Sequence, residues 1–192
     1  MQDCSSKRRI FWINGIGKET VYASVSLALL SWYALFSVLE TTDETDFSYK
    51  EALNRFVDGS LKFGPENEEY ITIQDGTAKG ELIGGNLSLI RGMVVGKYSI
   101  DFTDKILFLE ELGLETDPAG ISNHLYYMKQ NGVFKKIKGL WIGNYEHESG
   151  ITLEKIIMDV LDGEYKFPII KSNNFGHIER KTVIPIGTKA EI

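Results

Sequence analysis

The sequence ILFLEE, at residues 106–111, places four apolar residues directly before two neighbouring glutamates. A short apolar run of this kind is typical of a strand that is buried on both faces of a sheet. The glutamates allow two interpretations. They are either a solvated strand end or catalytic carboxylates presented at the carboxyl edge of the sheet. The choice depends on the rest of the chain.

Segments typical of strands and helices alternate on both sides of this run. Further strands are predicted for residues 70–73 and 80–85, joined by a tight connection, and for residues 139–143, 167–171 and 182–187. Helices are predicted from residue 87 to about residue 95 after the cap Asn86, from Asp117-Pro118 to Asn131-Gly132, and from the cap Thr152 to Gly163. This alternation predicts a mixed α/β domain over residues 68–192. A family resemblance described below implies that it starts at residue 66 and has a small or barrel-like mixed sheet.

The pattern before residue 66 is harder to interpret. The sequence FGPENEE at residues 63–69 combines glycine, proline and acids, which indicates a domain boundary. A short helix is predicted for residues 49–59. NGIGKET at residues 14–20 lacks the spacing of a phosphate-binding loop and is interpreted as a turn.

Composition excludes some classes of function. The 192 residues carry a net charge of -6 with no long basic block, which argues against a nucleic-acid partner. Cys4 is the only cysteine, so no intramolecular disulfide can form, and a cytoplasmic location is expected. Neither a cofactor nor a metal site is predicted.

Residues 21–39 form a stretch of nineteen residues without a charge, preceded by basic residues and followed by acidic ones. This length is close to the roughly 20 residues that span a bilayer. Four serines dilute the stretch, so a buried or interface helix is favoured over a membrane anchor. Association of two copies through this surface is a further expectation.

Of the three histidines, His177 has the setting of a functional residue. His124 lies within a predicted helix, where a packing or surface role is expected. His147 lies between two glutamates in a flexible loop, where consecutive side chains rarely point at one metal ion. His177 lies in a polar loop between two apolar segments, and a carboxylate at a strand end, Glu110, is a candidate to fix its tautomer.

The glycines before the first predicted helix also allow two interpretations. Gly84, Gly85 and Asn86 could let the backbone approach a substrate at the start of the helix, whose amide groups favour an anion. A tight turn followed by a helix cap requires the same residues.

Four ordered motifs resemble the serine LD-carboxypeptidase family, peptidase family S66. They are GELIGGNLSLIRG at residues 80–92, ILFLEELG at residues 106–113, MKQNGVFKKIKGLWIGNYE at residues 128–146, and FGH with VIPIGTKAE at residues 175–191. The run at residues 131–149 is most similar to the microcin C immunity branch. The resemblance implies a serine hydrolase with a Ser-Glu-His triad, in which Glu110 and His177 match the family's glutamate and histidine. Glu111 is then expected to be a solvated neighbour.

One motif of the family, the turn that carries its catalytic serine, is not found in this sequence. The family's serine lies in an amino-terminal, amidotransferase-like α/β domain, in a turn of the G-Y/F-S-D type, and none of the thirteen serines of this chain has that context. Residues 1–65 are therefore expected to be a remnant of that domain with a linker. The implied substrates are murein peptides or aminoacyl-nucleotide-like amides. The alternative is a non-catalytic remnant, or a module that binds a ligand or partner.

Overall fold

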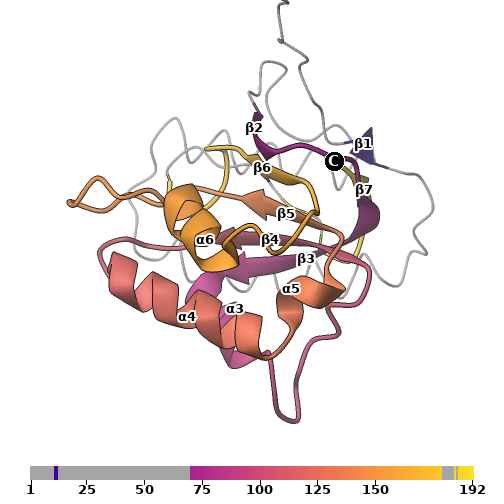
Figure 1. The fold of residues 1–192 in the computed structure, drawn as a ribbon, viewed down its shortest axis with the longest axis horizontal. Coiled ribbons are helices and arrows are strands. Elements are labelled where there is room, and N and C mark those ends of the chain that lie inside the picture. The colour runs from indigo at the N-terminus through magenta and orange to yellow at the C-terminus, as the bar shows by residue number, and fades with distance from the viewer. Residues whose placement is uncertain (1–10, 13–69, 179–183, 185) are drawn as a thin grey trace, which may run out of the picture.

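The computed structural model describes residues 11–12, 70–178, 184 and 186–192 (Figure 1). They form a mixed sheet of seven strands in the order β1-β7-β3-β4-β5-β6-β2. The strands are β1 (Phe11–Trp12), β2 (Ile71–Gln74), β3 (Lys79–Asn86), β4 (Lys105–Glu110), β5 (Gly139–Ile142), β6 (Ile169–Lys171) and β7 (Lys189–Glu191). The helices are α3 (Leu87–Gly92), α4 (Pro118–Gln130), α5 (Val133–Lys136) and α6 (Leu153–Leu161).

The centre of the sheet is a run of parallel strands that follow one another in the chain. β3, β4, β5 and β6 pair in this order, and the described helices lie in the connections between them. Because crossover connections between parallel strands are right-handed, stepping in one direction places all of these helices on the same face of the sheet. The larger core lies between this face and the helices (Figure 1).

β4 contributes to the cores on both faces of the sheet. Leu107 and Leu109 belong to the core under the helices, whereas Ile106 and Phe108 belong to a second core on the opposite face. This arrangement explains why the strand is apolar without alternation. Since side chains alternate along a strand, Glu110 follows Phe108 onto the face that the helices do not cover.

The local signals at the helix ends work as predicted. The side chains of Asn86, Asp117 and Thr152 accept hydrogen bonds from amides in the first turns of α3, α4 and α6. After α4, Gly132 has a φ of 74°, the left-handed conformation expected of a helix stop. α3 ends at Gly92, earlier than the predicted end near residue 95.

Two features of the sheet and one helix differ from the prediction. β2 does not pair with β3, which follows it in the chain, but with β6 at the other end of the parallel run. The last strand is β7 at Lys189–Glu191, so the strand predicted at residues 182–187 is wrong for the residues described there: Ile184 is outside any strand, and Ile186 and Gly187 form a turn. The short helix α5 was not predicted.

The remaining predictions for the amino-terminal part lie outside the described residues, except that the predicted remnant includes β1. They are the remnant and linker at residues 1–65, the uncharged stretch at residues 21–39, the helix at 49–59 and the boundary at 63–69. In the part of the chain that the structure describes, no helix combines the length and apolar character needed to cross a membrane.

Candidate active site

Glu110 and His177 are in direct contact. Nδ1 of His177 lies 2.8 Å from Oε2 of Glu110, within hydrogen-bond distance. Glu110 is the last residue of β4, and its side chain is 11 % exposed; His177 lies in the segment after β6, and its side chain is 36 % exposed. The predicted geometry is confirmed, across 67 positions of the chain.

The segment that carries His177 is irregular but anchored. Phe175 is buried and packs against Trp141 with 4.6 Å between ring centroids. The carbonyl oxygen of Phe175 accepts a hydrogen bond from the amide of Asn144, at 2.9 Å. Trp141 in turn donates its indole N–H to the hydroxyl of buried Ser172. The backbone two residues before His177 is therefore tied to the end of β5.

Gly176 allows this segment to approach Glu110 closely. Its φ is 116°, which residues with a side chain rarely adopt. A Cβ at this position would lie 3.2 Å from Oε2 of Glu110 and 3.3 Å from the carbonyl oxygen of Asn144. A glycine is needed here for both reasons.

Glu111 is not the solvated neighbour that the sequence predicted. It is 2 % exposed. Its Oε1 accepts hydrogen bonds from Nδ2 of Asn86, at 2.6 Å, and from the amide of Leu112, at 2.9 Å. Its Oε2 accepts one from the amide of Ser88, at 2.9 Å. The reason for the error is tertiary, because the start of α3 supplies the donors.

Gly84, Gly85 and Asn86 have structural roles in this fold. A Cβ on Gly84 would lie 1.9 Å from the carbonyl oxygen of Phe108 in the neighbouring strand, so pairing of β3 with β4 requires a glycine there. Asn86 caps α3 and binds Glu111. None of the three lines the cleft described next, and their contact with a substrate stays a prediction.

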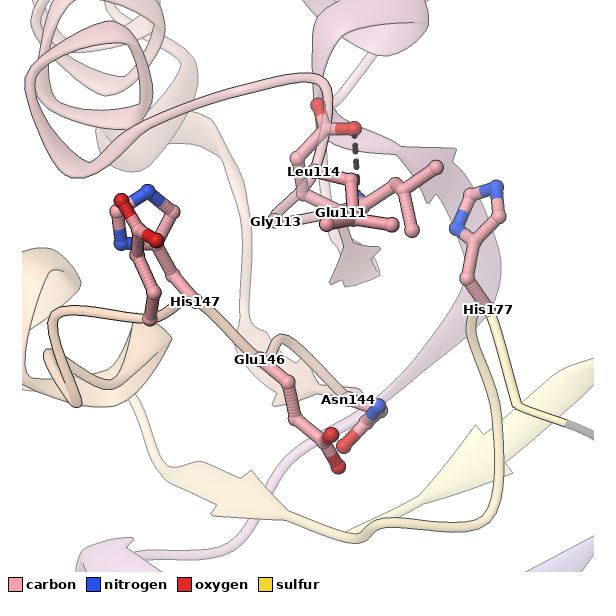
Figure 2. A pocket seen from close by; sticks show the side chains of 9 residues that line it. Glu111, Gly113, Leu114, Asn144, Glu146, His147 and His177 are labelled. Carbon is pink, nitrogen blue, oxygen red and sulfur yellow. Dashed lines mark hydrogen bonds between the residues drawn. The ribbon is translucent and has the colours of Figure 1, made fainter.

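His177 lies at the edge of a cleft of about 660 Å³ (Figure 2). The other lining residues come from the connections after β4 and β5: Glu111, Leu112, Gly113, Leu114, Asn144, Glu146, His147 and Glu148. Figure 2 shows His177 and His147 on opposite sides of the opening, with Glu111 and Leu114 between them. The cleft therefore lies where α/β sheets bind ligands, beyond the carboxyl ends of parallel strands.

Sequence reasoning assigned no site role to the cleft residues after β5. Asn144, Glu146 and Glu148 directly follow a buried strand, and that position was the signal that could have indicated them. His147 was considered only as a metal ligand. Its Nδ1 lies 2.8 Å from the hydroxyl of Ser149.

Tyr145 connects the two loops that line the cleft. Its hydroxyl donates to the carbonyl oxygen of Thr116, at 3.1 Å, and its ring stacks on that of His147. Burial raises the pKa of Tyr145, and the negative charges of Asp117 and Glu111 act in the same direction. The hydroxyl therefore stays protonated, as its donor role requires. Among the described residues, no group of three or more His, Cys, Asp or Glu side chains is arranged to hold a metal ion.

Comparison with known proteins agrees with this fold. The family model for the LD-carboxypeptidase C-terminal domain matches residues 79–192. The chain belongs to the LD-carboxypeptidase family. The family and the α/β fold predicted from the sequence are thus confirmed.

Curated relatives match most of this chain but are longer than it. A curated relative, the "Probable murein peptide carboxypeptidase" of Bacillus subtilis (strain 168), is 27% identical over 153 residues, which are 77% of this chain and 43% of that protein. The chain thus spans less than half the length of this relative.

Solved structures show the same fold. MccF in complex with glutamyl sulfamoyl guanosine aligns with a TM-score of 0.65 at 20% identity, over 80% of this chain and 54% of MccF. The muramoyltetrapeptide carboxypeptidase from Oxalobacter formigenes aligns with a TM-score of 0.55 at 22% identity, over 73% of this chain and 54% of that one. At these identities the likeness concerns the fold alone.

Proposed function

We propose that this domain supplies the general base and its orienting carboxylate to a serine-type hydrolase of amide bonds. The observation that carries the proposal is the 2.8 Å contact between Glu110 and His177 beside the cleft. A histidine held by a buried carboxylate is the base half of a Ser-His-acid triad.

In this proposal each atom of the pair has a role. Glu110 Oε2 accepts the Nδ1 proton of His177, which leaves the lone pair of the neutral imidazole on Nε2. Nε2 takes the proton of a serine hydroxyl while the serine oxygen attacks the amide carbonyl. The imidazolium then gives that proton to the leaving amine, and water hydrolyses the acyl-enzyme by the same steps. Glu110 stabilises the imidazolium throughout.

The nucleophile comes from outside the described residues in this proposal. No serine is among the residues that line the cleft. Ser172 is the described serine nearest to His177 in the sequence, but it is 1% exposed and engaged by Trp141. The serine that approaches Nε2 of His177 is then either one in the part of this chain that the structure does not describe, without the G-Y/F-S-D context, or one in that context on another chain.

Two substrate classes follow from the relatives. The Bacillus subtilis relative is named for murein peptides, and MccF was solved with aminoacyl sulfamoyl nucleosides. We propose a small peptide of the murein type or an aminoacyl-nucleotide-like amide as substrate, with the reaction in the cytoplasm.

A chimera tests the proposed role of the domain. Residues 70–192 replace the matching part of the Bacillus subtilis relative, and hydrolysis of a murein tetrapeptide is followed by mass spectrometry. We expect activity that His177→Ala and Glu110→Ala abolish and His124→Ala leaves in place. A folded chimera whose activity is indifferent to His177 contradicts the proposal.

A non-catalytic binding module is the second candidate, because no serine lines the described cleft. A fluorophosphonate probe on the full chain separates the two candidates, since labelling requires an activated serine. Labelling that is lost in His177→Ala shows that this chain itself completes the triad. Unlabelled full chain, together with an inactive chimera, supports the binding module.

A further inference from the structure

Glu111 occupies an unusual position for a carboxylate, because it is buried without a cation. It is 2 % exposed, and the described ion pairs do not include it. Three N–H donors surround it instead, from Asn86, Ser88 and Leu112. Such a set suits the ionised form, which only accepts hydrogen bonds. A buried carboxylate held this firmly calls for a reason beyond packing.

These donors join three elements at the end of β4. Asn86 is the last residue of β3 and lies opposite Glu110 in the parallel register. Ser88 lies in the first turn of α3, and Leu112 begins the connection to α4. The ladder between β3 and β4 ends at the pair of Asn86 and Glu110, and the carboxylate of Glu111 continues the attachment one residue further.

The backbone of Glu111 extends this attachment to the segment that carries His177. Its amide approaches the carbonyl oxygen of Asn144 at 3.5 Å, and the amide of Asn144 donates to the carbonyl oxygen of Phe175 at 2.9 Å. Phe175 lies two residues before His177. The side chain of Glu111 therefore holds the strand end from the helix side, while Glu110 and His177 meet on the other side.

We propose that Glu111 is a positioning residue, whose carboxylate fixes the end of β4 so that Glu110 holds His177 in the Nδ1–H tautomer. This inference rests on the proposed function for its meaning in catalysis, but the geometry can be tested without activity. Glu111 cannot take over the role of Glu110, because neighbouring residues of a strand point to opposite faces.

The polarity of the contact with Asn86 allows a matched test. Oδ1 of Asn86 accepts hydrogen bonds from the hydroxyl of Ser88 and the amide of Leu89, which leaves Nδ2 for Glu111. In Glu111→Gln the new side-chain NH2 group can face the Nδ2 group of Asn86, so that two donors meet. In Asn86→Asp two carboxylates face each other. The double variant N86D/E111Q restores one donor and one acceptor with reversed polarity and an unchanged net charge.

The readout is the long-range proton–nitrogen NMR spectrum of the imidazoles in the full chain, at a pH where they are neutral. His177 is assigned by the loss of its signals in His177→Gln. We expect the Nδ1–H tautomer in the wild type, its loss in Glu111→Gln and Asn86→Asp, and its partial return in the double variant, whose new amide nitrogen still faces the backbone N–H of Leu112 or Ser88. The core variant Ile157→Val serves as the control for general loss of stability and should leave the tautomer unchanged.

Each other outcome overturns the inference. If the wild type shows the Nδ1–H tautomer and Glu111→Gln retains it, Glu111 does not position the pair, while the proposed dyad stands. If the wild type lacks this tautomer, the dyad itself fails and the positioning role fails with it. Should Glu111→Gln not fold, Asn86→Asp decides, since a folded Asn86→Asp variant that keeps the Nδ1–H tautomer contradicts the coupling.

Discussion

The two faces of β4 differ in the side chains that they carry toward the carboxyl end of the strand. Under the helices, Leu107 and Leu109 are fully buried. On the opposite face, Ile106 and Phe108 lead to Glu110, which contacts the partly exposed His177 beside the cleft. The first residue after the strand, Glu111, has three hydrogen-bond donors around it, whereas the side chain of Glu110 contacts His177. One strand end thus carries a buried carboxylate surrounded by donors next to the carboxylate that we propose for catalysis.

The largest effect should come from removing the aromatic anchor on the His177 side. Phe175→Ala deletes a buried ring against Trp141 and should lower the free energy of unfolding by about 3–5 kcal/mol. It should also release His177 from Glu110. Denaturant unfolding measures the first effect, and the imidazole NMR spectrum measures the second.

Leu125→Ala is the matched change under the helices. Leu125 is fully buried, so a cost of about 2–5 kcal/mol is expected, without any change at His177. Equal disturbance of His177 by both variants would show that the two faces are not independent.

Substitution of Glu111 should lower the free energy of unfolding more than substitution of Glu110, although Glu110 is the residue proposed to act in catalysis. Glu111→Gln leaves a buried donor facing a donor and should cost about 1–3 kcal/mol. Glu110→Gln keeps an oxygen for the imidazole N–H and should cost less. Thermal and denaturant unfolding of both variants check this, and a larger cost for Glu110→Gln would reverse the assignment.

Gly176→Ala tests how closely the His177 segment must approach β4. Its positive φ and the 3.2 Å approach to Glu110 predict a loss of about 1–3 kcal/mol together with a disturbed His177. Gly150→Ala, at a φ of 69° with open space around it, shares the backbone strain but not the contact. It should cost less and leave the His177 signals as they are; indistinguishable variants would argue against a tight approach at Gly176.

The smallest effect should come from an ion pair on the helix side. Burial acts to raise the pKa of Glu154, but the hydrogen bond and charge of Lys171 outweigh it, so the pKa lies below its usual value of 4.5. A carboxyl whose pKa is lowered by folding stabilises the protein above its unfolded pKa, and the contribution is lost as the pH falls through the folded value.

Glu154→Gln should therefore lower the free energy of unfolding at pH 7 by about 1 kcal/mol or less. The difference from the wild type should shrink as the pH falls below 4.5. Asp159→Asn, at the exposed pair with Lys155, should change little at either pH. A difference for Glu154→Gln that grows in acid would contradict the sign of the shift.

The parts of the fold and of the site that the sequence predicted correctly are elements whose signals lie in neighbouring residues. The apolar run of β4, the caps at Asn86, Asp117 and Thr152, and the turn at Gly132 each depend on neighbouring residues, so the sequence was sufficient. Glu110 and His177 are 67 positions apart. Their spacing alone made the pair a candidate, and the resemblance to the family selected Glu110 as the partner of His177.

The errors share a different cause. β2 pairs with β6, and β7 forms after the predicted segment and pairs with β1 and β3. The partner of each strand depends on backbone that lies far away in the sequence. Glu111 was misjudged because its donors Asn86 and Ser88 lie 25 and 23 positions earlier in the chain.

By itself, the sequence determined that this chain builds alternating strands and helices, buries β4 on both faces and ends that strand with carboxylates. Only the tertiary structure decided that the second carboxylate, Glu111, is buried among hydrogen-bond donors and not solvated. The physical reason is that hydrophobic periodicity and capping act over a few residues, whereas the burial of a charge depends on donors brought together by the whole sheet.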